Sequence, residues 1–432
     1  MRFFKATGLL TLGCLALLLA VLNVGCSKSG SSPDAIKLSS WGDPKENAIL
    51  ADLIADFQKA HPDIKVELQR VPWGEYKTKL MTSVSAGIAP DVIFVSTDDV
   101  ATFANKEVLE PLDEYIKKDS FSMDDFFPTA REMYNINSHQ YALPRDLSPL
   151  GIVYYNKKAF DAAHLSYPTD DWNWKELLAD AKVLTKTDAA GKTSQWGYAE
   201  DWPMVEAWAF SAGGRWVDNP MNPNQYTFNS QAFIDGLQFR ADLVLKYKVC
   251  PGPSNMTAMG GLGASDLFTN GSTAMLMAGM WKIPAFRDIK DFDWDVVMFP
   301  KGPTGQRGFL NGSSGYGILK ASKNKQKAWE LVKYLSGPVG QKKLASTGLA
   351  QPALKSVSDS SAFLDGQKPA NKKMLNAAQA YAIFAPRATN WSEIMSGSIT
   401  PVLDQIWIGK LTGAEAVAKI AENLKDKPLV IK

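Results

Sequence analysis

The hydrophobic pattern between residues 36 and 96 alternates between the two-residue period of a strand and the 3.6-residue period of a helix. Strands are expected at residues 36–41, 64–71 and 91–96. The last strand is a nearly continuous apolar run, typical of a parallel strand buried on both faces. Helical patterns fill both intervals; the first ends at His61-Pro62, as helices do before proline, and the second spans about 74–86. This order predicts a doubly wound α/β lobe.

The loops that follow these three strands define a predicted binding surface. Ligands of a doubly wound sheet bind outside the carboxyl ends of its strands. The loops at that edge are Trp41-Gly42-Asp43, Pro72-Trp73-Gly74 and Ser96-Thr97-Asp98-Asp99. Two of them carry tryptophan and two carry acids, so the sequence predicts an aromatic and acidic rim at this edge.

A second set of strands and helices follows residue 150. Strands are expected at 152–155, 274–277 and 292–299, and helices at 174–184, 231–247 and 325–335. These later strands need a sheet of their own, so the chain is expected to form two lobes. Trp208, Trp216, Trp329 and Trp407 lie in helical patterns and are expected in the core.

The first 25 residues have the features of a secretion signal. Arg2 and Lys5 precede an uncharged apolar run over 6–22, and small residues lead to Cys26. The segment resembles a bacterial lipoprotein signal, in which Cys26 becomes the lipidated first residue, although Asn23 stands where that pattern prefers Leu, Val or Ile. Residues 26–33 are then a flexible tether. An uncleaved membrane helix and ordinary secretion are the alternatives.

The composition argues against nucleic-acid binding and against an internal disulfide. The chain has 47 Lys and Arg against 45 Asp and Glu. The signal contains Arg2 and Lys5 and no acid, so its loss leaves a mature chain without net charge. Such a chain lacks the excess of basic residues that binds nucleic acid. Of three cysteines, Cys14 leaves with the signal and Cys26 serves the anchor. Cys250 is then alone, and no internal disulfide is expected.

No catalytic or metal motif is found. The three histidines are far apart, no cysteine pair exists, and no nucleophile elbow or phosphate-binding loop has the required spacing. No metal and no cofactor are therefore expected. A glycan hydrolase stays open as an alternative, because its two catalytic acids can come from distant positions.

Six motifs in order resemble the sugar-binding family of extracellular solute-binding proteins of ATP-binding-cassette importers, which includes maltose-binding protein. The most specific is residues 151–160, Gly-Ile-Val-Tyr-Tyr-Asn-Lys-Lys-Ala-Phe, followed by Pro168 and Asp171-Trp172-Asn173-Trp174. The other motifs are Ala89-Pro90-Asp91-Val92, residues 268–275, Phe299-Pro300-Lys301-Gly302, residues 328–335 and Gly348-Leu349-Ala350-Gln351-Pro352-Ala353. The resemblance covers nearly all of residues 34–430.

The resemblance implies two doubly wound α/β lobes joined by a multi-segment hinge, the type II periplasmic-binding-protein fold. Residues 34–143 and about 320–360 are expected to form the N-terminal lobe, and 144–319 with about 361–432 the C-terminal lobe. The implied protein is a monomeric, non-enzymatic receptor in the cell envelope, anchored only by its lipid at the outer face of the cytoplasmic membrane, or periplasmic. It would capture a mono- or oligosaccharide, close, and dock on an importer permease.

Candidate ligand-binding residues follow from the chemistry of a sugar, which offers apolar C–H faces and a rim of hydroxyls. Aromatic side chains cover the faces and fixed polar groups meet the hydroxyls. Trp41, Trp73, Trp202 and Trp281 are the expected aromatic plates; the resemblance places a ligand-facing aromatic at Trp281. The expected hydroxyl ligands are Asp43, Asp98, Arg145, Asp146, Asp201 and Arg387, and Gly312, Gly315 and Tyr316 are expected on the hinge side.

Two alternatives remain for the arginines and acids among these residues. Each can be an exposed charge or part of an ion pair between the lobes. If Arg145 and Arg387 converge, the ligand would instead be an anion such as a glycerol phosphate ester.

Overall fold

Two β-sheets organise residues 34–431, the part of the chain that the computed structural model describes. The first sheet contains, in spatial order, β2 (Val66–Arg70), β1 (Ile36–Ser40), β3 (Val92–Ser96), β15 (Ser314–Ile318) and β6 (Leu143–Pro144). Strands β1, β2 and β3 run parallel, whereas β15 is antiparallel to both β3 and β6. Every residue of β3 is buried, as expected for a strand covered on both faces.

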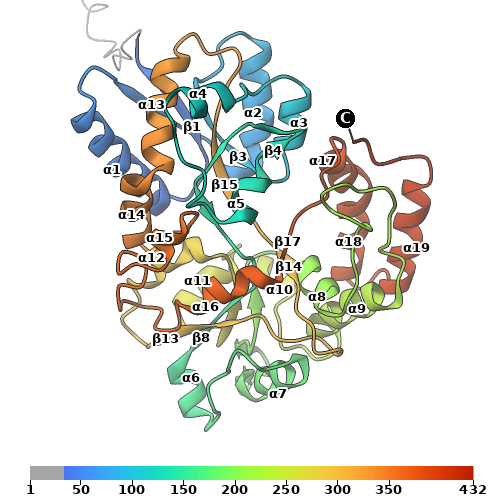
Figure 1. Ribbon diagram of the computed structural model, residues 1–432. Helices are drawn as coiled ribbons and strands as arrows, with labels where there is room; N and C mark the ends of the chain where they lie inside the picture. The colour runs from blue at the N-terminus through green and yellow to red at the C-terminus, as the bar shows by residue number, and fades with distance from the viewer. Residues whose placement is uncertain (1–33, 432) are drawn as a thin grey trace, which may run out of the picture. The chain divides into compact units, whose positions relative to one another are not determined.

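The second sheet contains, in spatial order, β11 (Ala199–Glu200), β12 (Met275–Met277), β8 (Ile152–Asn156) and β13 (Trp294–Met298). Strand β8 is antiparallel to both of its neighbours, and β11 is parallel to β12. In Figure 1 the first sheet lies in the upper part of the molecule and the second in the lower part, each with helices around it. The predicted fold class, two α/β lobes, is confirmed.

Helix α1 (Pro44–Ala60) shows why the first lobe folds as its sequence pattern predicts. Asp43 caps the helix by accepting a hydrogen bond of 2.9 Å from the Glu46 amide, and Pro44 occupies the first turn. The side chains on one stripe of the helix are buried: Leu50, Leu53, Ile54 and Phe57. Burial of each contributes about 1.5–3 kcal/mol, so the packed stripe holds the helix on the sheet.

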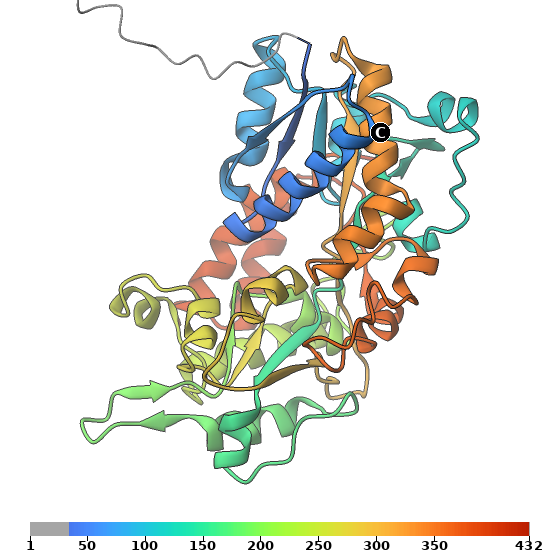
Figure 2. The same cartoon turned by 90° about the vertical axis from the view of Figure 1, so that its left-hand side faces the viewer.

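The other helices fall into two groups, one around each sheet (Figures 1 and 2). Around the first sheet lie α2 (Trp73–Ser85), α3 (Val100–Asn105), α4 (Asp113–Lys118), α5 (Pro128–Met133), α13 (Lys325–Ser336) and α14 (Pro338–Ser346). Around the second lie α6 (Lys157–Ala162), α7 (Trp174–Leu184), α8 (Val205–Ser211), α9 (Gln231–Leu245), α10 (Pro253–Ala258), α11 (Ala264–Thr269), η1 (Met280–Lys282), α12 (Ile283–Phe286) and α16 (Met374–Ala378).

The C-terminal segment forms its own layer on α8 and α9. It comprises α17 (Trp391–Ile394), the π-helical turn η3 (Met395–Ile399), α18 (Thr400–Trp407) and α19 (Gly413–Leu424). A second apolar cluster, which includes Trp216, Trp391 and Trp407, fills the space between these helices and α8 and α9. The segment also reaches the first lobe, because Thr102 Oγ1 donates to the Thr389 carbonyl at 2.8 Å.

Three chain segments pass between the two sheets: 145–151, 299–313 and 353–373. Two short strand pairs accompany them, β7 (Asp146–Leu147) with β16 (Gln351–Pro352) and β14 (Phe309–Leu310) with β17 (Ala382–Ile383). The predicted boundary at residue 319 placed residues 314–318 in the second lobe, yet these residues form β15 and pair with β3 in the first sheet. The remaining lobe boundaries stay predictions.

The predicted strands and helices are found within a few residues of their expected ends. Helix α7 spans the predicted 174–184, α9 is two residues shorter than its pattern, and Trp208, Trp216, Trp329 and Trp407 are all buried as expected. The sequence did not predict two short hairpins, β4–β5 (Asn135–Ile136, His139–Gln140) and β9–β10 (Lys186–Thr187, Thr193–Gln195). It also did not predict the short helix α15 (Lys355–Ser358). The signal, the tether and Cys26 lie outside the described residues.

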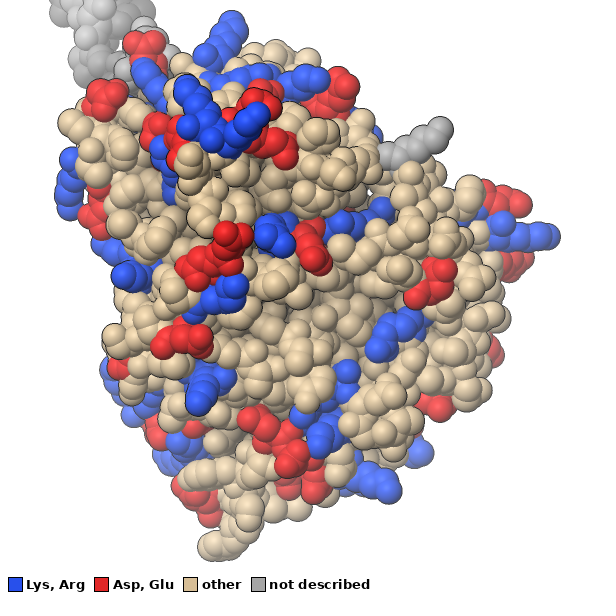
Figure 3. Space-filling view, viewed as in Figure 1, with Lys and Arg blue, Asp and Glu red and all other residues tan. Residues whose placement is uncertain are grey.

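The described residues contain no candidate membrane-spanning helix, and the face in Figure 3 carries charges of both signs. None of the helices between residues 34 and 431 has the length and apolar character needed to cross a bilayer. Over the face drawn in Figure 3, Lys and Arg side chains alternate with Asp and Glu.

Candidate functional site

A cavity of about 670 Å³ lies between the carboxyl ends of the strands of both sheets. The first sheet contributes the loops after β1 and β3 and the start of α2; the second contributes the loops after β11 and β12. Ten of the predicted ligand-binding residues line this cavity: Trp41, Asp43, Trp73, Asp98, Arg145, Asp146, Asp201, Trp202, Trp281 and Gly312. The edge that sheet geometry identified is therefore where the cavity lies, although a ligand-binding role for each residue stays a prediction.

Trp41 and Trp73 form an edge-to-face pair on the first lobe, with ring centroids 4.8 Å apart and an angle of 73° between the rings. Trp41 follows β1 directly and packs by its edge against Tyr76 and Phe94, which hold its ring in place. Trp73 is the first residue of α2 and is 59% exposed. In this pair the Trp41 indole is fixed by its packing, and the Trp73 indole is accessible to solvent.

Trp202 and Trp281 form a stacked pair on the second lobe, with centroids 5.6 Å apart and only 12° between their planes. The two indoles meet because β11 and β12 are parallel neighbours, so the loops that follow them leave the sheet side by side. We name this pair the indole shelf. A sugar ring cannot enter between the two indoles at this spacing, so the shelf can offer only an outer face to a ligand.

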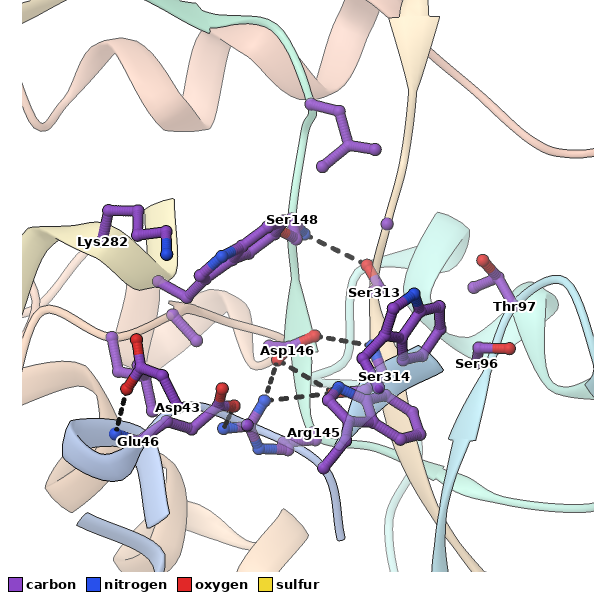
Figure 4. Close-up of a pocket in the computed structure, with 18 of the residues that line it drawn as sticks. Asp43, Glu46, Ser96, Thr97, Arg145, Asp146, Ser148, Lys282, Ser313 and Ser314 are labelled. Carbon is purple, nitrogen blue, oxygen red and sulfur yellow. Dashed lines mark hydrogen bonds and ion pairs between the residues drawn. The ribbon is translucent and has the colours of Figure 1, made fainter. Parts of the chain in front are cut away.

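A buried ion cluster lies at the floor of the cavity, between the lobes (Figure 4). The Arg145 guanidinium donates to Asp146 Oδ2 at 2.6 Å, to Glu46 Oε1 at 3.0 Å and to Ser314 Oγ at 3.1 Å. The Asp146 carboxylate also accepts from the amide and the hydroxyl of Ser314. Arg145, Asp146 and Glu46 are each less than 9% exposed. Burial raises the pKa of both carboxyls, and the arginine opposes that shift.

Two of the predicted acids on the other walls, Asp43 and Asp201, also have partners within the protein. Asp43 Oδ1 caps α1, as described above. Asp201 Oδ1 accepts from the amide and, at 2.8 Å, from the hydroxyl of Ser265. Its second oxygen lies 3.7 Å from the Lys282 ammonium, which lines the same cavity. Arg145, Asp146 and Asp201 are therefore all engaged in ion pairs, but only the pair of Arg145 with Glu46 fits the alternative of an ion pair between the lobes, because Asp201 and Lys282 both belong to the second lobe.

Asp98 is a cavity-lining carboxyl whose pKa is strongly raised. Its side chain is open to the solvent in the cavity, but the surrounding protein desolvates it. Desolvation, the neighbouring Asp99 and Glu206 on α8 together raise the pKa of Asp98 to about 7, against the smaller opposing effect of Lys77. Lys77 itself is bound to Asp99 at 2.5 Å and to Ser392 Oγ at 2.9 Å.

We expect Asp98 to make the stability of the protein fall as pH rises. The pKa of about 7 in the folded protein lies above the ordinary 3.8, so the folded state binds the proton more tightly than the unfolded chain. This contribution is present below pH 4 and is lost through pH 7. Urea unfolding of the wild type and of Asp98→Asn at pH 5 and pH 8 should show the variant, which cannot ionise at this position, gaining on the order of 1 kcal/mol of stability relative to the wild type at pH 8, a modest gain because cavity solvent screens the charge. A pH-independent difference would contradict this assignment.

Three predicted residues do not line the cavity. Arg387 points to the end of α5 and the start of β4, where its guanidinium donates to the carbonyls of Glu132 and Asn135. Tyr316 is buried on β15 with its ring against Phe94. Gly315, beside it, faces the Tyr134 ring, which a Cβ would approach within 2.9 Å. Arg145 and Arg387 therefore do not converge in this structure.

Several residues that line the cavity were not predicted. They are Gly42, Glu46, Ser96, Thr97, Ser148, Leu150, Lys282, Leu310, Ser313, Ser314, Leu349 and Ala350. Ser96 and Thr97 lie in the loop after β3, which the sequence analysis had already identified, and Lys282 is the neighbour of Trp281. These three residues could therefore have been predicted from their positions in the chain. The serines at 313 and 314 could not be found in this way, because β15 was not recognised as a strand of the first sheet.

Among residues 34–431, no group of three or more His, Cys, Asp or Glu side chains is arranged to hold a metal ion. The cavity is instead lined by four indoles, hydroxyls and paired charges. This is the chemistry of a site that binds a polar organic solute between two lobes.

Comparison with known proteins shows to which protein family this chain belongs. The family of bacterial extracellular solute-binding proteins matches residues 41–342, more than half of the chain, and the chain belongs to this family. Members of this family are binding proteins.

The chain is similar over most of its length to sugar-binding proteins from several bacteria. A galactooligosaccharide-binding protein of Bacillus subtilis is 24% identical over 420 residues, which is 95% of both chains. An ABC substrate-binding protein from Listeria monocytogenes, solved in complex with cycloalternan, has a TM-score of 0.81 and 28% identity, covering 90% of this chain and 98% of its own. Maltose-bound T. maritima MalE3 has a TM-score of 0.78 and 25% identity, covering 90% of this chain and 99% of its own.

Proposed function

We propose that this protein is the substrate-binding receptor of an ABC importer and captures a neutral oligosaccharide in the cavity between its lobes. The observation that carries the proposal is the placement of two tryptophan pairs, one from each sheet, on the walls of one cavity. Indoles on separate walls can cover the apolar faces of sugar rings, while the polar groups between them meet the hydroxyls. Relatives named for galactooligosaccharide, cycloalternan and maltose support this class of ligand.

A phosphate ester is the alternative, since UgpB from Mycobacterium tuberculosis, solved with glycerophosphocholine, shares the fold with a TM-score of 0.76 and 19% identity. The charges of this cavity disfavour it. Five carboxylates and two cations line the wall. Both cations are engaged, Arg145 by Glu46 and Asp146, and Lys282 by Asp201. An anionic ligand would meet a net negative wall with no free cation among these residues.

Calorimetric titration tests the choice of ligand. The panel contains maltose, a galactooligosaccharide, cycloalternan, mannotriose and glycerophosphocholine. We expect saturable, one-to-one binding of at least one neutral saccharide, no heat from glycerophosphocholine, and no product after prolonged incubation. Binding of glycerophosphocholine alone would replace the proposal by the phosphate-ester alternative, and turnover of a saccharide would replace it by a hydrolase.

Closure of the lobes over the ligand belongs to the same proposal. A ligand shifts the lobes only if it binds the closed arrangement more tightly than the open one, and a sugar touching both tryptophan pairs meets that condition. Small-angle scattering should show a smaller radius of gyration with the saccharide that binds. An unchanged radius would remove closure from the proposal.

Family membership places the protein outside the cytoplasm, in the cell envelope. We further propose that Cys26 carries a lipid that anchors the mature chain, and that the closed receptor docks on a membrane permease. The mass of the protein purified from membranes should include acyl groups on Cys26, and a mass without them would contradict the anchor. Reconstitution with the permease should give saccharide-dependent uptake, whose absence would contradict the docking.

A further inference from the structure

We propose that Gly279 is a positioning residue: its missing side chain makes the room in which the Trp281 indole lies stacked on Trp202. The proposal rests on the proposed function only in that the indole shelf is taken as a sugar-binding surface. Gly279 lies between the end of β12 and the turn η1 that carries Trp281.

The Trp281 indole folds back over its own backbone and lies against Gly279. A Cβ placed on Gly279 would stand 2.1–2.4 Å from three carbon atoms of that ring, whereas ordinary van der Waals contact begins at 3.4 Å. An alanine at 279 would therefore displace the ring by more than an ångström. The displacement would disturb the stacking on Trp202, whose ring lies nearly parallel to that of Trp281 at a centroid distance of 5.6 Å.

The carbonyl of Gly279 accepts two hydrogen bonds, and these bonds resist a movement of the backbone in place of the ring. The Tyr154 hydroxyl donates to the Gly279 carbonyl at 3.0 Å, and the Lys282 amide donates to the same carbonyl at 3.2 Å. Tyr154 is fully buried in the second lobe. The Trp281 ring, in contrast, borders the open cavity, so it is the group that has room to move.

The backbone angles show that space, and not conformational freedom, is what requires glycine here. Gly279 has φ −74° and ψ 158°, an extended conformation that alanine adopts without strain. Gly279→Ala should therefore fold with an almost unchanged melting temperature, while its indole shelf is broken.

The position of the indole can be measured without any ligand. Protein labelled with fluorotryptophan gives ¹⁹F resonances for its 13 tryptophans, and Trp281→Leu assigns the one from Trp281. We expect Gly279→Ala to shift the Trp281 resonance, as Trp202→Leu does by removing the ring stacked on it. Gly397→Ala is the matched control, because Gly397 has no heavy atom near its added Cβ, and it should leave the resonance in place.

The effect on the site is measured by a double-mutant cycle with the saccharide identified in the panel. We expect Gly279→Ala to weaken binding at least fivefold in the wild type and to have no further effect in Trp281→Leu, because it acts only through that indole. An unshifted ¹⁹F resonance would overturn the proposal. So would an equal loss of affinity in both backgrounds, which would assign the effect to the backbone. If no saccharide binds, the proposed function fails, while the ¹⁹F result still decides whether Gly279 positions the ring.

Discussion

Trp281→Ala is expected to weaken binding of the preferred saccharide at least tenfold while leaving the melting temperature nearly unchanged. The variant removes one of the two rings of the indole shelf, and loss of an aromatic surface that covers a sugar face removes about 1.5–3 kcal/mol of binding free energy. Stability is preserved because the ring borders a cavity that already exists, so no new void opens in the core.

Calorimetric titration and a thermal melt of the same preparation check this expectation. Trp329→Phe is the matched control, because Trp329 is fully buried between helices of the first lobe and its indole donates to Asp119. It should lower the melting temperature and leave the affinity unchanged. An unaltered affinity in Trp281→Ala would remove the indole shelf from the binding site.

Arg145→Met is expected to be the most destabilising single change in the cavity, by about 3–5 kcal/mol at neutral pH. The arginine is the shared partner of Glu46 and Asp146, and its removal leaves two buried carboxyls without a cation. Their pKa values, already raised by burial, would rise further. The folded variant then binds protons more tightly than the unfolded chain, so stability is lost as pH rises through neutrality and is partly regained toward pH 5.

Urea unfolding at pH 7.5 and pH 5 measures both parts of this prediction. The triple variant Glu46→Gln, Arg145→Met, Asp146→Asn serves as the control, because it removes the three charges together. We expect it to recover much of the lost free energy, since no uncompensated charge remains buried. A loss below 1 kcal/mol in Arg145→Met, or a loss independent of pH, would contradict the role of Arg145 as the cation that compensates the two buried carboxylates.

The parts of the site that the sequence predicted are those fixed by the position of a loop in an α/β sheet. Trp41, Asp43, Trp73 and Asp98 follow from the strand–helix order, because the carboxyl ends of neighbouring parallel strands must meet. Trp281 was predicted through the family resemblance, and its neighbour Trp202 then stacks on it because β11 and β12 pair in parallel.

The parts that the sequence could not predict depend on contacts between distant residues. Glu46 lies in the first turn of a helix, where a carboxylate is normally solvated, and only Arg145, 99 positions further on, makes its burial possible. Arg387 has a long side chain whose direction is set by the carbonyls of Glu132 and Asn135, which no local pattern reveals. The boundary error at β15 has the same origin, because pairing partners of a strand are not encoded in the strand itself.

The four cavity tryptophans also give this protein a built-in optical reporter. The indole shelf and the Trp41–Trp73 pair border solvent that a ligand would displace, whereas Trp208, Trp216, Trp294 and Trp329 are packed inside the lobes. Entry of a saccharide would change the polarity around the first group and leave the second as a constant background. Emission spectra of the unlabelled protein can therefore follow occupancy in real time, at concentrations far below those that heat measurements require.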